Sequence, residues 1–135
     1  MWVKLARAAA TMGKLSRENI ELFGLTEPQF GVLETLGHKG VLTLGELGKK
    51  RLVSGGNITC VVDNLEKEGL VERVFNDEDR RIIEVRLTKK GKALFERVFV
   101  QHAEWISSLA AVLTEEEQEQ LARLCKKLGL GLAGE

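Results

Sequence analysis

The run Asn76-Asp-Glu-Asp-Arg-Arg81 has the residue types and spacing of a charged recognition site. Two adjacent guanidinium groups, those of Arg80 and Arg81, follow the carboxylate of Asp79. At the tip of a turn, guanidinium groups can enter the narrow minor groove of DNA, where negative potential is concentrated. A neighbouring carboxylate can hold one of them in a fixed geometry. Taken alone, however, the run is more typical of an ordinary charged turn exposed to solvent.

A polar arc on the segment 55–68 is the second candidate site. The apolar residues of this segment recur at helical spacing and predict one buried stripe: Ile58, Val61, Val62 and Leu65. The opposite arc carries small or hydrogen-bonding side chains, which suit base edges in a DNA major groove: Gly56, Asn57, Thr59, Cys60, Asp63, Asn64 and Lys67. Because a carboxylate there would repel phosphate, Asp63 is expected to pair with a nearby basic residue or to accept from a cytosine amine. For a lone amphipathic helix, a merely solvated face would be the better interpretation.

Helix-start signals flank both candidate sites. Ser54 is expected to accept N–H groups from the first turn of a helix, and Gly55 and Gly56 let the backbone approach a phosphate. Thr88 is expected to cap a later helix in the same way. The remaining signals are capping boxes at 26–29, 43–46 and 114–117, and helix stops at Gly37/Gly40 and at Gly69.

These signals predict the order of the elements. Helices are expected at about 3–22, 27–36, 44–51, 55–68, 89–113 and 115–128, and strands at 71–76 and 81–87 form a hairpin. Three helices followed by a hairpin, over residues 26–91, are typical of a winged helix, with a tight helix-turn-helix link at 52–54. The predicted fold class is mainly α with a small β-hairpin wing. The chain is expected to be one domain, 1–135, with dimerisation helices at 1–22 and 92–135.

The composition is that of a globular domain with balanced charge. The chain has 135 residues, 44% of them hydrophobic, and a formal net charge of zero. Residues 43–92 carry 11 basic and 9 acidic groups, whereas residues 93–135 carry 4 and 7, so basic charge gathers mildly in the middle. The two cysteines lie far apart, and no uncharged stretch reaches the length of a membrane span. These features favour a reducing cytoplasm and no membrane partner.

The helix expected at 89–113 is too apolar for a single buried stripe. One side is expected to pack on its own domain and the other on a second copy of the chain, with the alanine-rich first helix and the last helix completing the interface. Cys125, beside Leu121, Leu124 and Leu128, is expected in the core. A monomer with a buried long helix is the alternative, which the size limit on a single core disfavours. A homodimer would place two recognition helices roughly 34 Å apart, in successive major grooves.

Linked motifs along the chain resemble the MarR/SlyA family of bacterial transcriptional regulators. They are Leu25-Thr-Glu-Pro-Gln-Phe-Gly-Val-Leu33, Asn57-Ile-Thr, Val62-Asp-Asn-Leu-Glu-Lys-Glu-Gly-Leu-Val71, Asp77-x-Asp-Arg-Arg81 and Leu87-Thr-Lys-Lys-Gly91. The resemblance implies a homodimer that binds a pseudo-palindromic operator in double-stranded DNA, represses transcription, and is released by a small ligand or by oxidation. The short N-terminus and the short, glycine-rich C-terminus depart from the family pattern.

The resemblance also implies roles for matching residues. It places Arg81 in the minor groove, oriented by Asp79 and assisted by Arg80, and it makes the helix face around Asn57 and Thr59 the reader of the major groove. The expected DNA contacts are Ser54, Gly55, Gly56, Asn57, Thr59, Cys60 and Asn64 on the helix, Arg73, Asp79, Arg80 and Arg81 on the wing, and Lys49, Lys50, Arg51, Lys67 and Lys89 to phosphate.

Two regulatory sites are further hypotheses. A small-molecule effector is expected between the helical interface and the winged helix, with Phe30, His102 and Trp105 as candidate pocket residues, although aromatic side chains at helical spacing are usually core. Oxidation of Cys60 would place a polar or bulky group against DNA. No basic residue lies within one helical turn before Cys60, which favours an unreactive small residue over a redox sensor. No cofactor or metal site is indicated.

Two other classes of function compete with DNA binding. An enzyme is disfavoured because neither histidine, His38 or His102, lies near a nucleophile, paired carboxylates or a metal-ligand cluster. A winged helix used for protein–protein contact is the stronger rival, since fold does not dictate function. The basic residues expected around one face favour DNA, because a protein-contact version has no need of them: Lys49, Lys50, Arg51, Arg73, Arg80, Arg81 and Lys89.

Overall fold

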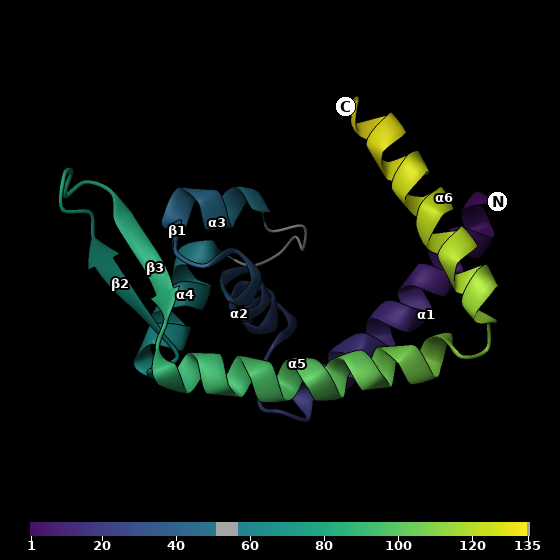
Figure 1. Ribbon diagram of the computed structural model, residues 1–135, viewed down its shortest axis with the longest axis horizontal. Coiled ribbons are helices and arrows are strands. Elements are labelled where there is room, and N and C mark those ends of the chain that lie inside the picture. Colours follow the sequence, from purple (N-terminus) through teal and green to yellow (C-terminus); the bar gives the residue numbers. More distant parts are fainter. Residues whose placement is uncertain (51–56, 135) are drawn as a thin grey trace. The chain divides into compact units, whose positions relative to one another are not determined.

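The computed structural model describes residues 1–50 and 57–134, without the side chain of Lys50. The helices are α1 Trp2–Glu21, α2 Glu27–Lys39, α3 Leu44–Lys50, α4 Ile58–Lys67, α5 Lys89–Ala110 and α6 Glu115–Ala133, and the strands are β1 Leu42–Thr43, β2 Val71–Phe75 and β3 Ile83–Leu87 (Figure 1). This confirms the predicted fold class. The predicted link at 52–54, together with Arg51, Ser54, Gly55 and Gly56, lies outside the described residues. The chain forms two compact units, Met1–His102 and Ala103–Glu135.

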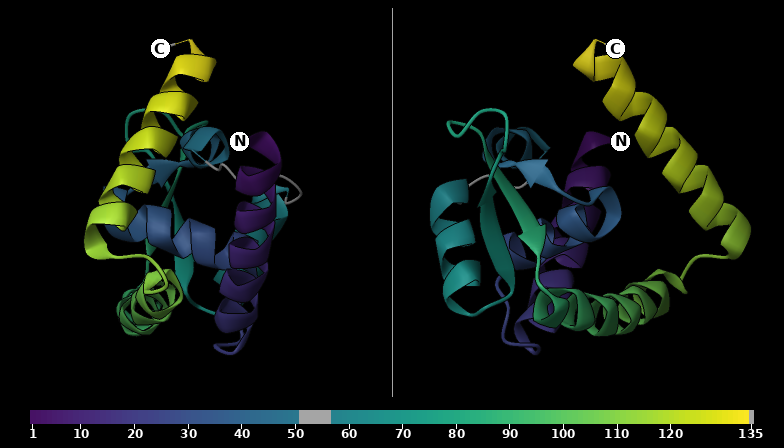
Figure 2. Two further views of the ribbon diagram at one scale, coloured as in Figure 1. Left: turned by 90° about the vertical axis from the view of Figure 1, so that its right-hand side faces the viewer. Right: turned by 60° about the vertical axis from the view of Figure 1, so that its left-hand side comes forward.

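The first unit contains a three-stranded antiparallel sheet in the order β1-β3-β2. Strand β2 pairs with β3 from Val71–Leu87 to Phe75–Ile83, as the predicted hairpin requires. Strand β1 was not expected, because two residues are too short to show an alternating pattern. Its Thr43 also begins α3, where it forms the predicted capping box: the Thr43 N–H donates to Glu46 and the Glu46 N–H donates to the Thr43 hydroxyl. In the strand order β1-β3-β2, strand β2 is at an edge of the sheet, and α4 lies beside it (Figure 2).

The core of the first unit lies between the sheet, α2, α3, α4 and the first half of α5. Its fully buried side chains come from all of these elements: Val32, Leu33, Leu47, Val62, Leu65, Val71, Val85 and Val98. The predicted buried stripe of α4 is confirmed, since Val61, Val62 and Leu65 are buried and Ile58 packs against them. Burial of this stripe fixes the rotation of α4 about its axis.

Helix α2 ends later than expected. It continues through Gly37, where the ring of Phe95 packs against the glycine and a Cβ would lie 2.3 Å from Cε2 of that ring. Of the two expected stops, Gly40 is confirmed and Gly37 is not. The helix ends at Gly40, whose φ of 80° is a conformation that other residues rarely adopt.

Thr88 joins the start of α5 to the turn between α4 and β2. Its backbone N–H donates to Leu70 O (3.1 Å), its hydroxyl donates to Gly69 O (2.6 Å), and Gly91 N–H donates to the hydroxyl oxygen (3.0 Å). The expected capping role of Thr88 is thus confirmed. Gly91 lies so close to this turn that a Cβ would be 1.9 Å from Leu70 O. Only glycine fits there, which gives the Thr88–Gly91 motif a packing reason.

The second unit consists of the end of α5 and of α6. Helix α6 begins with the predicted Thr114 capping box and has no buried side chain among its described residues. Its leucines Leu121, Leu124 and Leu128 are 48%, 52% and 36% exposed. Cys125 is exposed as well, so its expected core position is wrong for a single chain, because nothing in this unit covers that face.

Replacement of Gly91 by alanine should destabilise the protein, since the new methyl group would collide with the backbone carbonyl of Leu70. We expect the free energy of unfolding to fall by about 2–3 kcal/mol, at the upper end of overpacking effects. Urea or thermal unfolding followed by circular dichroism measures the change. The matched control is Gly31→Ala in α2, where no atom beyond the adjacent residues and the helix's own backbone lies within 4 Å of the added Cβ and helix propensity should raise stability slightly. Equal effects of the two substitutions would contradict the close approach at Gly91.

Candidate nucleic-acid interface

Asn76 organises the loop of the wing between β2 and β3. Its side-chain oxygen accepts hydrogen bonds from the N–H groups of Glu78 (2.9 Å) and Asp79 (3.2 Å), and its amide nitrogen donates to Glu84 (2.7 Å). The loop is closed by bonds from Asn76 N–H to Ile82 O and from Ile82 N–H to Asp79 O, both 3.0 Å. Asn76 was expected only as the first residue of the turn, although asparagine at this position is a known signal for organising a turn.

Asp79 clasps Arg81 at the tip of this loop. Its Oδ1 accepts from the backbone N–H (3.0 Å) and Nε (3.1 Å) of Arg81, and its Oδ2 accepts from an Nη (3.1 Å). The guanidinium lowers the pKa of Asp79 and the carboxylate raises the pKa of Arg81, so both stay charged at neutral pH. The Arg81 side chain is nevertheless 91% exposed. An exposed guanidinium is thus held in a defined orientation by its carboxylate partner, as the motif predicted.

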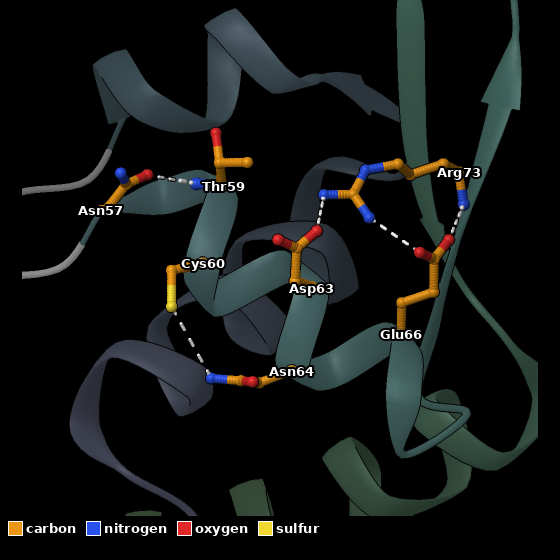
Figure 3. Close-up of polar contacts among 7 residues, drawn as sticks. All are labelled: Asn57, Thr59, Cys60, Asp63, Asn64, Glu66 and Arg73. Atoms are coloured by element: carbon orange, nitrogen blue, oxygen red, sulfur yellow. Dashed lines mark hydrogen bonds and ion pairs between the residues drawn. The ribbon is translucent and has the colours of Figure 1, made fainter.

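The polar arc of α4 faces solvent. Asn57, Thr59, Cys60, Asn64 and Lys67 are all exposed. Asn57 caps the helix, with its Oδ1 accepting from Thr59 N–H (2.9 Å). The expected DNA contact thus has a structural role as well, and only its amide nitrogen points outward as a donor (Figure 3).

Arg73 is engaged in contacts within the chain itself. It was expected to contact DNA, but its guanidinium donates to Asp63 Oδ1 (2.5 Å) and Glu66 Oε1 (2.7 Å), and its side chain is only 20% exposed (Figure 3). The expected pairing of Asp63 with a nearby basic residue is thereby confirmed. Glu66 also accepts from the backbone N–H of Arg73 (3.2 Å). Glu66 was missed, although its position three residues after Asp63 places both on neighbouring turns.

The structure describes three of the five residues expected to contact phosphate. Lys49, Lys67 and Lys89 are exposed, whereas Arg51 and the side chain of Lys50 lie outside the described part of the chain. Arg80 is exposed next to Arg81. Cys60 is an exposed free cysteine whose neighbour is the Asn64 amide nitrogen, 4.0 Å from its sulfur. Its redox role stays a prediction.

Two of the three candidate pocket residues meet in the first unit. The rings of Phe30 and His102 pack edge to face with centroids 5.2 Å apart, and both residues are buried. His102 Nδ1 lies 2.9 Å from Asn19 Oδ1 and Nε2 lies 3.3 Å from the Ser16 hydroxyl, which suits a neutral ring. Trp105 belongs to the other unit. A hollow of about 330 Å³ elsewhere in the first unit has none of the three residues in its lining, which includes Leu36, Val41, Arg86 and Phe95.

Among residues 1–50 and 57–134, no helix is long and apolar enough to cross a membrane. Within the same ranges, no three His, Cys, Asp or Glu side chains gather as metal ligands would.

A helix with a polar exposed face, beside a hairpin whose tip presents a clasped arginine, defines a protein of the winged-helix class. Comparisons with known proteins agree. A sequence profile of the MarR family matches residues 25–83. The transcriptional regulator MhqR of Bacillus subtilis is 37% identical over 130 residues, covering 96% of this chain and 90% of that protein. The chain belongs to the MarR family.

Two further similarities bear on function. The transcriptional repressor MdtR of Bacillus subtilis is 34% identical, covering 82% of this chain and 72% of its own length. The crystal structure of a mutant MarR protein from E. coli in complex with operator DNA superposes with a TM-score of 0.79 at 30% identity, covering 93% of this chain and 94% of that one.

The buried ring of His102 predicts a pH dependence of stability. Burial lowers its pKa below the ordinary value of about 6.5, and Glu34 opposes this shift in part. Above that value the ring is neutral in both the folded and the unfolded chain, and its contribution to stability is complete. As the pH falls through 6.5, the unfolded chain takes up a proton first, so stability decreases.

The measurement is the free energy of unfolding between pH 8 and pH 5 (roughly the range in which histidine titrates) for the wild type and for His102→Asn. Since the two proteins differ only at this residue, the difference between the two curves isolates His102. We expect the wild type to lose more stability over this range than the variant. Parallel curves would show that His102 is protonated as readily in the fold as in the unfolded chain.

Proposed function

We propose that this protein is a transcriptional repressor of the bacterial cytoplasm that binds a pseudo-palindromic operator in double-stranded DNA as a homodimer. In this proposal α4 enters the major groove with Asn57, Thr59, Cys60 and Asn64, and Arg81 enters the adjacent minor groove with Arg80 beside it. Lys49, Lys67 and Lys89 contact phosphates. We assign no catalytic activity to the protein.

The observation that carries the proposal is the geometry of Asp79 and Arg81. A charged turn without a ligand has no need to hold an arginine by three hydrogen bonds while leaving it 91% exposed. A preoriented guanidinium suits the narrow minor groove, because few rotamers are lost on binding. The operator complex of the E. coli MarR protein, which shares this fold, gives the proposal a structural precedent.

Unpartnered apolar side chains support the homodimer. In the second unit, Val112 is 89% and Leu132 is 80% exposed, in addition to the three leucines of α6. In the first unit, Trp2 and Val3 of α1 are 69% and 57% exposed. Apolar surface of this extent is typical of a protein interface. Release from DNA by a small-molecule effector is part of the proposal, but the structure favours no residues for that site.

The rival function is that of a winged helix that contacts other proteins. The salt dependence of binding to duplex DNA distinguishes it from a DNA-binding function. A DNA-binding dimer releases counterions from each phosphate that it neutralises, so its affinity for random duplex DNA should fall steeply as salt increases. We expect a log–log slope equivalent to several phosphates per dimer, measured by fluorescence anisotropy at increasing KCl concentrations. A flat slope, or no binding at low salt, would favour the rival.

Arg81→Ala tests the wing directly. The variant should bind the operator more weakly by roughly 1–3 kcal/mol, with unchanged dimerisation, because the lost side chain is 91% exposed and bonds only to its loop neighbour Asp79 among the described residues. The probe is the duplex that the wild type selects from a random-sequence pool, and the measurement is a titration with sedimentation analysis as the check on dimerisation. Normal binding by the variant would refute the minor-groove assignment.

Asp79→Asn is the matched variant, because charge and orientation predict opposite results. Removal of a carboxylate near phosphate should tighten binding to any duplex if Asp79 acts only through its charge. If it orients Arg81, the variant should bind the selected duplex more weakly while binding a shuffled duplex equally well or better. Tighter binding to the selected duplex would show that the clasp does not assist recognition.

A further inference from the structure

We propose that Arg73 is a positioning residue for DNA recognition, which fixes α4 relative to the wing by holding Asp63 and Glu66. This inference rests on the proposed DNA-binding function, and it adds a residue that acts on specificity without contacting DNA. The group Asp63, Glu66 and Arg73 is called the clamp below.

The clamp attaches the helix to the strand at more than one point. The Arg73 guanidinium reaches carboxylates from two successive turns of α4, and Glu66 also accepts from the backbone N–H of Arg73. Since that N–H lies on the free edge of β2, the strand cannot shift along α4 without breaking these bonds. The planar fork of arginine can serve two carboxylates at once, which the single point charge of a lysine cannot do in the same geometry.

The contrast with Arg81 separates the two arginines by function. Arg73 is 20% exposed and bonded to two carboxylates, whereas Arg81 is 91% exposed and bonded to one. Both lie on the β2–β3 hairpin: Arg73 is in β2, next to α4, and Arg81 is in the loop. Displacement of the hairpin against α4 would therefore move Arg81 away from its groove while the recognition helix stayed in place.

The clamp also removes a repulsion that the sequence left unexplained. Asp63 and Glu66 are 49% and 42% exposed on the helix that reads DNA, and each would repel phosphate if unpaired. Neutralisation alone, however, would not need the backbone bond from Arg73 to Glu66. The clamp can therefore act in two ways, by neutralising the two carboxylates or by fixing the strand to the helix. Replacement of the three charged side chains by neutral amides distinguishes these two effects.

The test is the triple variant Asp63→Asn, Glu66→Gln, Arg73→Gln, which removes one net negative charge. If the clamp acts through charge alone, the variant binds every duplex equally well or more tightly. If it positions the wing, the ratio of affinities for the wild-type-selected duplex and a shuffled duplex of equal length should fall roughly tenfold, a typical coupling for residues in one network.

The matched control is Glu72→Gln with Arg86→Gln. This pair, with Arg86 Nε 2.6 Å from Glu72 Oε1, is also a carboxylate–guanidinium contact on the sheet, but it joins β2 to β3 and makes no bond to α4. Its loss should leave the affinity ratio unchanged. An equal fall in the control would show that any ion pair on the sheet has the effect, and would overturn the proposal.

Arg73→Lys decides the matter if the triple variant does not fold. It keeps the charge but not the fork, so the ratio should fall by several-fold while the variant remains a folded dimer by circular dichroism and sedimentation. An unchanged ratio in a folded variant would overturn the positioning role. A wild type that selects no sequence from the pool would instead refute the proposed function, and the two failures are therefore distinguishable.

Discussion

Burial of one stripe of α4 is the constraint on which the rest of the interface depends. Val62 and Leu65 are fully buried, so the helix cannot rotate about its axis without exposing them, at a cost of about 1.5–3 kcal/mol for each side chain. The opposite arc is thereby turned outward as one surface. Asp63 lies in that arc beside β2. Its carboxylate is paired there with the guanidinium of Arg73 from the strand.

Features that depend on nearby residues could be predicted from the sequence, and those that depend on distant partners could not. The capping boxes and the buried stripe of α4 are local patterns, and the structure confirms them. The close approach of Gly91 to Leu70 joins residues 21 positions apart in sequence, and no local pattern marks it. Strand β1 also escapes prediction, because its two residues gain strand geometry only by pairing with β3.

The same distinction between near and distant partners applies to Arg73 and Cys125. Arg73 has the type and the location of a DNA contact, and only the fold reveals that two carboxylates, seven and ten residues earlier, occupy its guanidinium. By contrast, Asp79 and Arg81 are two residues apart, so their clasp could be predicted from the motif alone. Cys125 was misplaced because an apolar helical pattern does not say whether the chain's own domain or a partner covers it.

Arg73 and Arg81, two of the arginines of the hairpin, show how a protein of zero net charge can present an interface to a polyanion. A guanidinium has five N–H donors. In Arg73 each of the two Nη atoms donates to a different carboxylate, which connects β2 to α4. In Arg81 one carboxylate takes Nε and one Nη, so donors on the other side remain directed outward. The pair Asp79–Arg81 is itself neutral, and it therefore offers oriented donors more than attraction. In the proposed complex, long-range attraction would then come from Arg80 and the exposed lysines, and recognition of the groove from Arg81.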